Sequence, residues 1–182
     1  PGERILDACA GVGGKSTHLA ALASGRARID AVDVSARKLA LLAEHAARLG
    51  AAGIHPVEAD LTSPGERVGE AYDRVLLDAP CTGLGVLRRH PEAKWSRSPE
   101  DVTAMAALQA RLLDALAPRV RAGGLLVYSV CSFEPEEPTQ MVERFLRQNP
   151  GFVLESAAPF LPASVVDERG FMLVLPHLHG CD

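Results

Sequence analysis

The sequence lacks the features of several function classes. Its apolar stretches are far shorter than the roughly 20 residues of a membrane-spanning helix, so we expect neither a membrane partner nor a signal peptide. The four cysteines form no C-x-x-C pair and no other metal-ligand spacing, and we expect no metal. A disulfide scaffold is a poor match for a chain of 182 residues with an ordinary core, which favours reduced cysteines in a cytoplasmic protein.

The sequence also lacks an excess of positive charge, because its net charge at pH 7 is −4. This balance argues against a chain that binds nucleic acid with its whole surface. A local exception is the segment 88–97, RRHPEAKWSR, which holds four basic residues against one glutamate. With 47% apolar and 23% charged residues, the chain is predicted to form one globular domain, which we expect to be a monomer.

Short apolar runs alternate with helical patterns along the chain. Strands are predicted over 4–8, 28–34, 54–60, 73–80 and 123–132. Helices are predicted over 15–24, 36–49, 99–117 and 135–149. This alternation is typical of an α/β, Rossmann-like fold, in which helices cover both faces of a mostly parallel, twisted sheet. The tail from about 151 contains two further strand-like runs, 152–156 and 171–176.

The glycine-rich corner at 7–17, DACAGVGGKST, fits two phosphate-binding patterns incompletely. The triphosphate loop, G-x-x-x-x-G-K-[ST], matches at its end but needs a glycine where Cys9 stands. The dinucleotide pattern, G-x-G-x-x-G, matches at Gly11 and Gly13 but needs a third glycine where Ser16 stands. Each pattern fails at one defining position.

Four acidic residues lie at or near the carboxyl ends of the first four predicted strands, namely Asp7, Asp33, Asp60 and Asp78. In a parallel sheet these ends meet at one edge, where ligands bind. Four carboxylates would repel the phosphates of ATP or NAD, but they suit the hydroxyls, amine, ammonium and sulfonium of S-adenosylmethionine. Asp33 follows Gly13 by 20 residues, the usual offset of an acid that binds ribose. Alternatively, each aspartate caps a helix or hydrates a loop.

Two cysteines, Cys81 and Cys131, lie at the ends of the fourth and fifth predicted strands. If these strands are neighbours, about 4.8 Å apart, both thiols face one crevice. The commoner role of a cysteine is that of a small buried hydrophobe. Chemistry offers another role, because carbon 5 of a pyrimidine is a poor nucleophile. A thiolate that adds to carbon 6 lets carbon 5 attack a methyl sulfonium, with acid–base help at N3 and at carbon 5.

Several stretches resemble the catalytic domain of the RsmB/Sun family of RNA cytosine-5 methyltransferases. They are DACAGVGGKSTHLA, AVDVS, YDRVLLDAPCTGLGVLRRHPEAKW, LQARLLDALAPRVRAGGLLVYSVCSFEPEE and LPHLHG, which together span nearly the whole chain. The paired D-A-P-C and Y-S-x-C-S motifs are highly specific. The resemblance implies an enzyme that transfers a methyl group from S-adenosylmethionine to carbon 5 of a cytosine in RNA. Ribosomal RNA is the expected partner, and transfer RNA remains an alternative.

The resemblance also implies roles for individual residues. Cys131 would be the nucleophile at carbon 6, Cys81 would assist release of the methylated base, and Asp78 would lie near N3 and the methionine end. The implied cofactor-binding residues are Cys9, Ala10, Gly11, Val12, Gly13, Gly14, Lys15, Asp33, Lys38, Asp60 and Asp78. The basic segment suits phosphate contact and ordering around a flipped base, although it also fits an ordinary charged loop. Its expected RNA contacts are Arg88, Arg89, His90, Lys94 and Trp95.

The sequence departs from the family pattern in a few places. Val12 stands where the family has proline, and Val130 stands where it has threonine. The family continues past the Pro-His segment into a further strand and carries an N-terminal RNA-binding region. Because this chain lacks both and starts without methionine, we expect a piece of a larger protein. Three other functions stay open: a non-catalytic RNA-binding or assembly module, a small-molecule or protein methyltransferase, and a P-loop nucleotidase.

Overall fold

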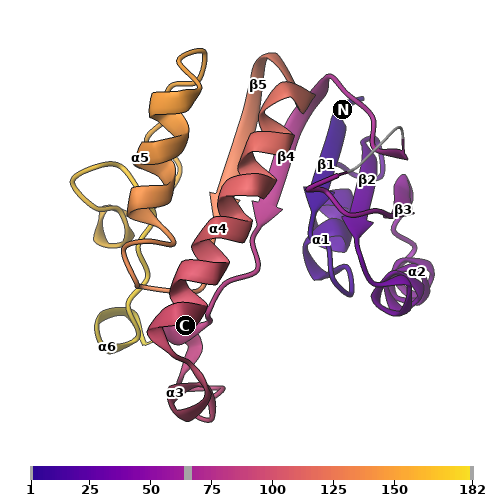
Figure 1. Ribbon diagram of the computed structural model, residues 1–182. Coiled ribbons are helices and arrows are strands. Elements are labelled where there is room, and N and C mark those ends of the chain that lie inside the picture. The colour runs from indigo at the N-terminus through magenta and orange to yellow at the C-terminus, as the bar shows by residue number, and fades with distance from the viewer. Residues whose placement is uncertain (1, 64–66, 181–182) are drawn as a thin grey trace. The chain divides into compact units, whose positions relative to one another are not determined.

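The computed structural model describes residues 2–63 and 67–180, and the chain divides into two compact units (Figure 1). The first unit comprises Pro1–Pro80 and Ala107–Ser129, and the second comprises Cys81–Ala106 and Val130–Asp182. Helix α4 (Pro99–Leu116) begins in the second unit and ends in the first.

A parallel sheet with the strand order β3-β2-β1-β4-β5 forms the centre of the first unit. Its strands are β1 (Arg4–Ala8), β2 (Arg28–Asp33), β3 (Ile54–Glu58), β4 (Tyr72–Asp78) and β5 (Val120–Ser129). The chain builds outward from β1 to β3 and then returns to the other side of β1 with β4. This reversal makes the carboxyl ends of β1 and β4 the topological switch point, where α/β sheets bind ligands. The predicted α/β, Rossmann-like fold class is confirmed.

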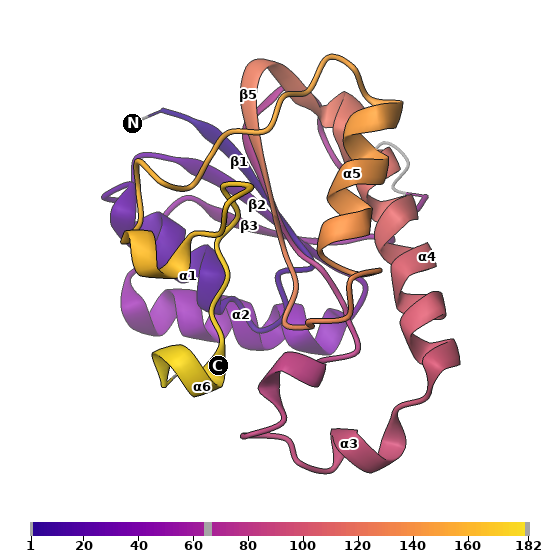
Figure 2. The ribbon, with the colours of Figure 1, turned by 90° about the vertical axis from the view of Figure 1, so that its left-hand side faces the viewer.

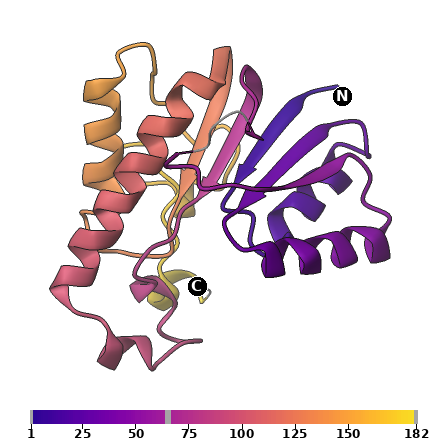
Figure 3. The same cartoon turned by 45° about the vertical axis from the view of Figure 1, so that its right-hand side comes forward.

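Helices cover both faces of this sheet (Figures 2 and 3). On one face lie α1 (Gly14–Leu22) and α2 (Ala36–Leu49), and on the other lies the second half of α4. Right-handed crossovers require this arrangement, because the chain moves across the sheet in opposite directions on the two sides of β1. Ala20 of α1 packs with Ile5 and Ile29, whereas Leu39 and Leu42 of α2 are buried with the sheet residue Ala31.

Local residues at the helix ends explain where two of the predicted helices begin and end. Helix α2 spans the predicted 36–49, begins after Ser35, whose hydroxyl accepts from the N–H of Lys38, and stops at Gly50. Gly50 has a φ of 62°, which glycine adopts at no steric cost. At the start of α4, the Ser98 N–H donates to Asp101 Oδ2 at 2.8 Å, and the Asp101 N–H donates to Ser98 Oγ at 3.4 Å. These reciprocal bonds satisfy donors that a helix start otherwise leaves unpaired.

Strand β5 starts and ends earlier than the predicted 123–132. The glycine pair at 123–124 suggests that a strand starts there. In the structure the pair lies inside β5, where the register between β4 and β5 shifts. Tyr72 pairs with Val120, whereas Arg74 pairs with Leu125, so the β5 side carries the extra residues. Bulges of this kind are a common place for glycine in strands.

The second unit consists of short helices and loops. Its helices are η2 (Leu84–Val86), α3 (Ala93–Ser96), the first part of α4, α5 (Thr139–Gln148), η4 (Ala163–Val165) and α6 (Pro176–His179). Helix α5 buries Met141 and Phe145, and Phe145 packs edge to face on Phe152 with 5.0 Å between ring centroids. It begins at Thr139 rather than at 135, because Pro138 disfavours the helical conformation at the residue before it.

The two strands predicted in the C-terminal tail are wrong. The runs 152–156 and 171–176 contain no strand, and the described residues of the tail form one isolated antiparallel bridge, between Val166 and Met172. Val153 and Met172 remain exposed. A strand needs a partner for its backbone N–H and C=O groups, and an apolar run does not reveal whether such a partner is within reach.

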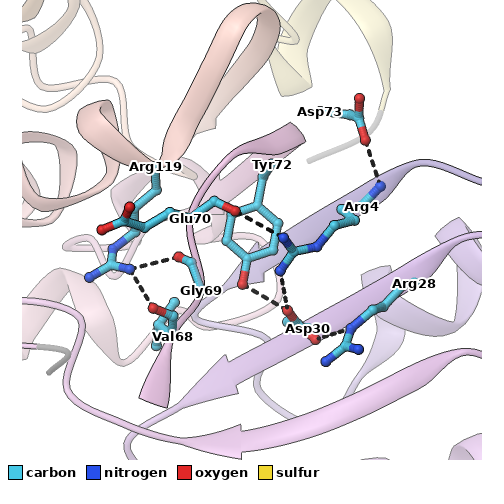
Figure 4. Close-up of polar contacts among 9 residues, drawn as sticks. All are labelled: Arg4, Arg28, Asp30, Val68, Gly69, Glu70, Tyr72, Asp73 and Arg119. Atoms are coloured by element: carbon cyan, nitrogen blue, oxygen red, sulfur yellow. Dashed lines mark hydrogen bonds and ion pairs between the residues drawn. The ribbon is translucent and has the colours of Figure 1, made fainter. Parts of the chain in front are cut away.

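A polar network joins three strands at the amino edge of the sheet (Figure 4). The hydroxyl of Tyr72, which is fully buried, donates to Asp30 Oδ2 at 2.7 Å. Arg28 Nε donates to Asp30 Oδ1 at 3.3 Å, and the guanidinium of Arg4 lies over the Tyr72 ring at 5.0 Å. Burial, followed by the bond to Asp30, raises the pKa of Tyr72 to about 12. The network ties β1, β2 and β4 together at the edge opposite the switch point.

Replacing Tyr72 with phenylalanine is expected to lower the free energy of unfolding by about 1.5–3 kcal/mol, because Asp30 loses a buried donor. Tyr128→Phe is the matched control, since the Tyr128 hydroxyl donates to the neutral Gln109 Oε1 at 3.1 Å. Its loss should be about 0.5–1.5 kcal/mol. Urea unfolding of both variants measures the difference, and equal losses would contradict the assigned strength of the Tyr72–Asp30 bond.

Candidate active site

A cleft of about 380 Å³ lies at the carboxyl ends of β1 and β4 in the first unit. Its walls are formed by Asp7, Cys9, Ala10, Gly11, Val12, Gly14, Lys15 and Asp78. Seven of these eight residues are among the predicted cofactor-binding residues. Asp7 is the eighth, and the sequence indicates it only as one of four strand-end acids. The glycine-rich corner and the switch point therefore form one site.

The corner turns sharply because three of its residues adopt left-handed backbone conformations. Cys9 has a φ of 62°, Gly11 of 58° and Gly13 of 88°. Such a φ is rare for a residue with a side chain, which makes Cys9 an unusual member of the turn. Gly13 lies outside the cleft wall and packs on α2, where an added Cβ would be 2.5 Å from Leu42 Cγ. Gly13 thus lets α1 and α2 approach closely.

Two side chains from α2 and β2 hold this corner in place. The carboxylate of Asp33 accepts from the N–H of Gly11 through Oδ2 and from the N–H of Ser35 through Oδ1, each at 2.9 Å. His45 Nδ1 lies 2.9 Å from the carbonyl oxygen of Val12. Because a carbonyl only accepts, this nitrogen carries the proton of the bond. The predicted ribose contact of Asp33 stays a prediction, since each carboxylate oxygen retains acceptor capacity.

Asp7 is the most deeply buried acid of the cleft, with 1% of its surface exposed. Its Oδ2 accepts from the hydroxyl of Ser16 at 2.5 Å, whereas its Oδ1 is buried without a hydrogen-bond partner. Burial raises the pKa of Asp7 to about 6, although the bond from Ser16 opposes this rise. A buried acceptor oxygen in a cleft wall suits a ligand that brings an N–H donor or a positive charge.

Lys15 and Asp78 form an ion pair across the cleft. The other oxygen of Asp78 accepts from the hydroxyl of Ser129 at 2.8 Å, so β5 helps to orient this carboxylate. Burial and the nearby charge of Asp33 raise the pKa of the Cys9 thiol to about 12. The Cys9 thiol therefore stays protonated at neutral pH, and the residue contributes only to the shape of the cleft.

Three predicted cofactor residues, Gly13, Lys38 and Asp60, do not line the cleft, and neither does Asp33. Asp60 follows β3 by two positions, and its Oδ1 accepts from both the N–H and the hydroxyl of Thr62. These bonds lower the pKa of Asp60. Contacts of these four residues with a bound cofactor remain predictions.

In the second unit, the two predicted catalytic cysteines lie together. Cys81 Sγ and Cys131 Sγ are 3.2 Å apart, much farther than the roughly 2.05 Å of a disulfide bond. The N–H of Cys131 also donates to Cys81 Sγ at 3.3 Å. Cys81 is half-buried and Cys131 is exposed. The fourth cysteine, Cys181, lies outside the described residues.

This pairing follows from the sheet, because β4 and β5 are neighbours and Asp78 pairs with Ser129. Cys81 and Cys131 come three and two residues after these strand ends. The bond with Cys131 and burial hold the pKa of the Cys81 thiol well above its usual range. Cys81 thus keeps its proton at neutral pH and can serve as a donor to a neighbouring sulfur.

The basic segment 88–97 contains the short helix α3 and a widely exposed tryptophan. Trp95 is 84% exposed, and Lys94 Nζ lies 5.2 Å from its ring centroid. Arg88 Nη1 donates to the carbonyl of Gly180 at 2.8 Å, and His90 Nδ1 lies 3.3 Å from a Glu92 oxygen. Arg89 is exposed. RNA contact by this segment stays a prediction.

Two negative findings concern only the part of the chain that the structure describes. Within it, no three His, Cys, Asp or Glu side chains are grouped as a metal ion would require. Likewise, none of the helices of residues 2–63 and 67–180 has both the length and the apolar character needed to cross a bilayer.

A Rossmann-like sheet with a glycine-rich cleft at its switch point defines the chain as a ligand-binding α/β protein of the doubly wound class. Residues 1–182 match the family described as 16S rRNA methyltransferase RsmB/F. The chain belongs to this family. It is 38% identical over 185 residues to a probable ribosomal RNA small subunit methyltransferase B of Bacillus subtilis, covering 99% of the chain and 41% of the relative.

Further relatives agree with this membership. A protein of the same description from Synechocystis is 40% identical, with 100% of the chain and 42% of the relative covered. A solved structure described as NSun6 from Pyrococcus horikoshii with SFG has a TM-score of 0.85 at 32% identity, covering 97% of the chain and 44% of that structure. The chain spans about two fifths of the length of these curated relatives. Membership of a methyltransferase family and the SFG-containing neighbour support S-adenosylmethionine as the cofactor.

Gly13→Ala is expected to lower the free energy of unfolding by about 2–4 kcal/mol. The left-handed backbone accounts for about 1–2 kcal/mol, and overpacking against Leu42 accounts for a similar amount. Gly11→Ala is the matched control, because its φ is also positive but an added Cβ meets nothing within 4 Å. Denaturant unfolding should show the larger loss for Gly13→Ala, and the reverse order would refute the packing role of Gly13.

Proposed function

We propose that this chain is the catalytic domain of an S-adenosylmethionine-dependent RNA methyltransferase that modifies carbon 5 of a cytosine in ribosomal RNA. The observation that carries the proposal is the pair of cysteine sulfurs, 3.2 Å apart, just beyond the ends of β4 and β5. A small-molecule or protein methyltransferase would have no task for Cys131. A nucleotidase would not need either thiol.

The cleft of the first unit fits the cofactor on chemical grounds. S-adenosylmethionine supplies an electrophilic methyl group on a sulfonium and carries an ammonium group. In this proposal, the unpaired Oδ1 of Asp7 accepts from that ammonium, and the positive φ of Gly11 allows the backbone of the corner to approach it closely. In this proposal, Asp33 contacts the ribose and Asp60 the adenine.

The reaction begins with a new bond from the Cys131 sulfur, as its thiolate, to carbon 6 of the cytosine. The displaced electron pair makes carbon 5 nucleophilic, and an acid that donates a proton to N3 neutralises the negative charge that develops there. Asp78 is the residue that we propose near N3. S-adenosylmethionine, held at the glycine-rich corner, would supply the methyl group to carbon 5, with S-adenosylhomocysteine as the leaving group. A base removes the proton of carbon 5, the electron pair forms the 5,6 double bond again, and the Cys131 thiolate leaves carbon 6.

Cys81 assists this last step through its retained proton. The sulfur of Cys131 becomes a thiolate when it leaves carbon 6, and a thiolate is stabilised by a hydrogen-bond donor. The Cys81 thiol is adjacent and stays protonated at neutral pH, because burial and its partner raise its pKa. A protonated Cys81 also does not compete with Cys131 as nucleophile.

The two cysteines should respond to mutation in opposite ways. Cys131→Ala is expected to abolish methyl transfer while S-adenosylmethionine still binds, whereas Cys81→Ala should accumulate a covalent RNA–protein adduct. Bisulfite sequencing of ribosomal and transfer RNA measures the transfer and identifies the substrate, and a denaturing gel shows the adduct. Full activity of Cys131→Ala would remove this residue from the mechanism. Modified transfer RNA with unmodified ribosomal RNA would correct the substrate.

Cofactor affinity is expected to depend on pH through Asp7. Its raised pKa of about 6 means that the carboxyl is mostly neutral at pH 5 and mostly ionised at pH 7. Because an ammonium group binds the ionised form better, the Kd of S-adenosylmethionine should be about tenfold weaker at pH 5 than at pH 7.

Calorimetric titration of three proteins tests this dependence. Asp7→Asn should bind more weakly at pH 7 and show no such change with pH. Glu44→Gln, an exposed position on α2, should behave as the wild type. A flat profile in the wild type between pH 5 and 7 would disprove the contact between Asp7 and the ammonium group.

A further inference from the structure

A buried carboxylate lies next to the two cysteine loops of the second unit. Glu137 is fully buried, and so is Thr82, with 1% of its surface exposed. Glu137 Oε2 accepts from the N–H of Thr82 at 3.0 Å, and Oε1 accepts from the hydroxyl of the same residue. Burying a carboxyl group costs free energy unless its oxygens are hydrogen-bonded, so the burial of Glu137 points to a specific role for its side chain.

The direction of the hydrogen bonds makes Glu137 the end point of a chain of donors. Thr82 gives its hydroxyl proton to Glu137, so the Ser132 hydroxyl must donate in the 3.1 Å contact between Ser132 Oγ and Thr82 Oγ1. The N–H of Glu134 in turn points to Ser132 Oγ at 3.4 Å. The bonds run from the loop after Cys131 through the loop after Cys81 to one carboxylate.

Thr82 and Ser132 are the residues that directly follow the two cysteines. A bond between their hydroxyls therefore fixes the separation of the loops one residue away from the sulfurs. Main-chain contact supports the same geometry, because the N–H of Gly85 donates to the carbonyl of Cys131 at 2.9 Å. An added Cβ on Gly85 would be 2.9 Å from that oxygen, so the loops approach as closely as a glycine allows.

We propose that Glu137 is a positioning residue, which holds Cys81 and Cys131 in contact through Thr82 and Ser132. The role rests on the proposed function, because that function requires both sulfurs at one base. A carboxyl group offers two acceptor oxygens, and both contact Thr82, which makes Glu137 a suitable anchor for the loops. Without it, the loops separate and the release step loses its donor.

The contact can be measured without any RNA, by the rate at which the two thiols form a disulfide. Diamide accepts the two electrons and two protons that the thiols lose. Tryptic digestion places Cys81 in the peptide 75–88 and Cys131 in the peptide 122–144, so mass spectrometry detects their cross-link specifically. Glu137→Ala should slow this cross-link by about an order of magnitude. Glu137→Gln keeps one acceptor and should lie between Glu137→Ala and the wild type.

Glu136→Ala is the matched control, because this neighbouring acid is exposed, and it should cross-link at the wild-type rate. In RNA methyl transfer, Glu137→Ala should reduce kcat by about 100-fold and leave the KM for S-adenosylmethionine unchanged. If Glu137→Ala does not fold, Thr82→Val replaces it, since this variant removes the hydroxyl link at nearly constant volume.

The outcomes separate the two proposals. A wild-type protein that transfers no methyl group to RNA refutes the proposed function, while the cross-linking rates still decide the role of Glu137. Slow cross-linking in Glu137→Ala or Thr82→Val, with partial recovery in Glu137→Gln, supports the positioning role. Cross-linking at the wild-type rate in a folded Glu137→Ala or Thr82→Val protein overturns it, whatever the activity.

Discussion

The parallel pairing of β4 with β1 on one side and β5 on the other is the constraint on which the site depends. It brings the strand-end acids Asp7 and Asp78 to one cleft and sets Asp78 opposite Ser129, which orients it. A slip of one residue would turn these side chains to the opposite face of the sheet. The apolar residues of the same strands oppose that slip, because it would disrupt their close packing against the helices on both faces of the sheet. The core therefore fixes the chemistry of the cleft.

The hydrogen bonds of the glycine-rich corner explain why it suits a cationic ligand and not a polyphosphate. A phosphate loop binds its ligand with free backbone N–H groups. Here the N–H of Gly11 donates to Asp33, the N–H of Gly13 donates to the carbonyl of Ala10, and the ammonium of Lys15 pairs with Asp78. These donors are already engaged, whereas Asp7 keeps a buried acceptor oxygen. The cleft thus offers an unpaired acceptor oxygen and not free donors, which favours a ligand that carries positive charge.

Much of this could be predicted from the sequence, because the relevant signals are local. Strand β1 and helix α2 span the residues that their apolar patterns predict, and α2 ends just before Gly50. Seven of the eight cleft residues belong to one short motif, 7–17. The errors and omissions concern contacts between distant segments. The bond from His45 to Val12 joins residues 33 apart, and that from Thr82 to Glu137 joins residues 55 apart. Neither contact leaves a periodic pattern in the sequence. The strands predicted at 152–156 and 171–176 were wrong for the same reason, because strand pairing also depends on distant segments.

In the proposed reaction, Cys131 must first attack carbon 6 and later leave it, and these two steps require opposite properties of its sulfur. A second thiol beside it would resolve this conflict. Cys131 is exposed, as the proposed nucleophile must be, whereas Cys81 is half-buried and its pKa is raised. If both thiols lost their protons, two thiolates would lie 3.2 Å apart and repel each other. In this proposal, Cys81 stabilises the departing thiolate only while the two sulfurs remain in contact. The proposed reaction would therefore require a rigid support for both loops, and the buried carboxyl group of Glu137 is suited to provide it.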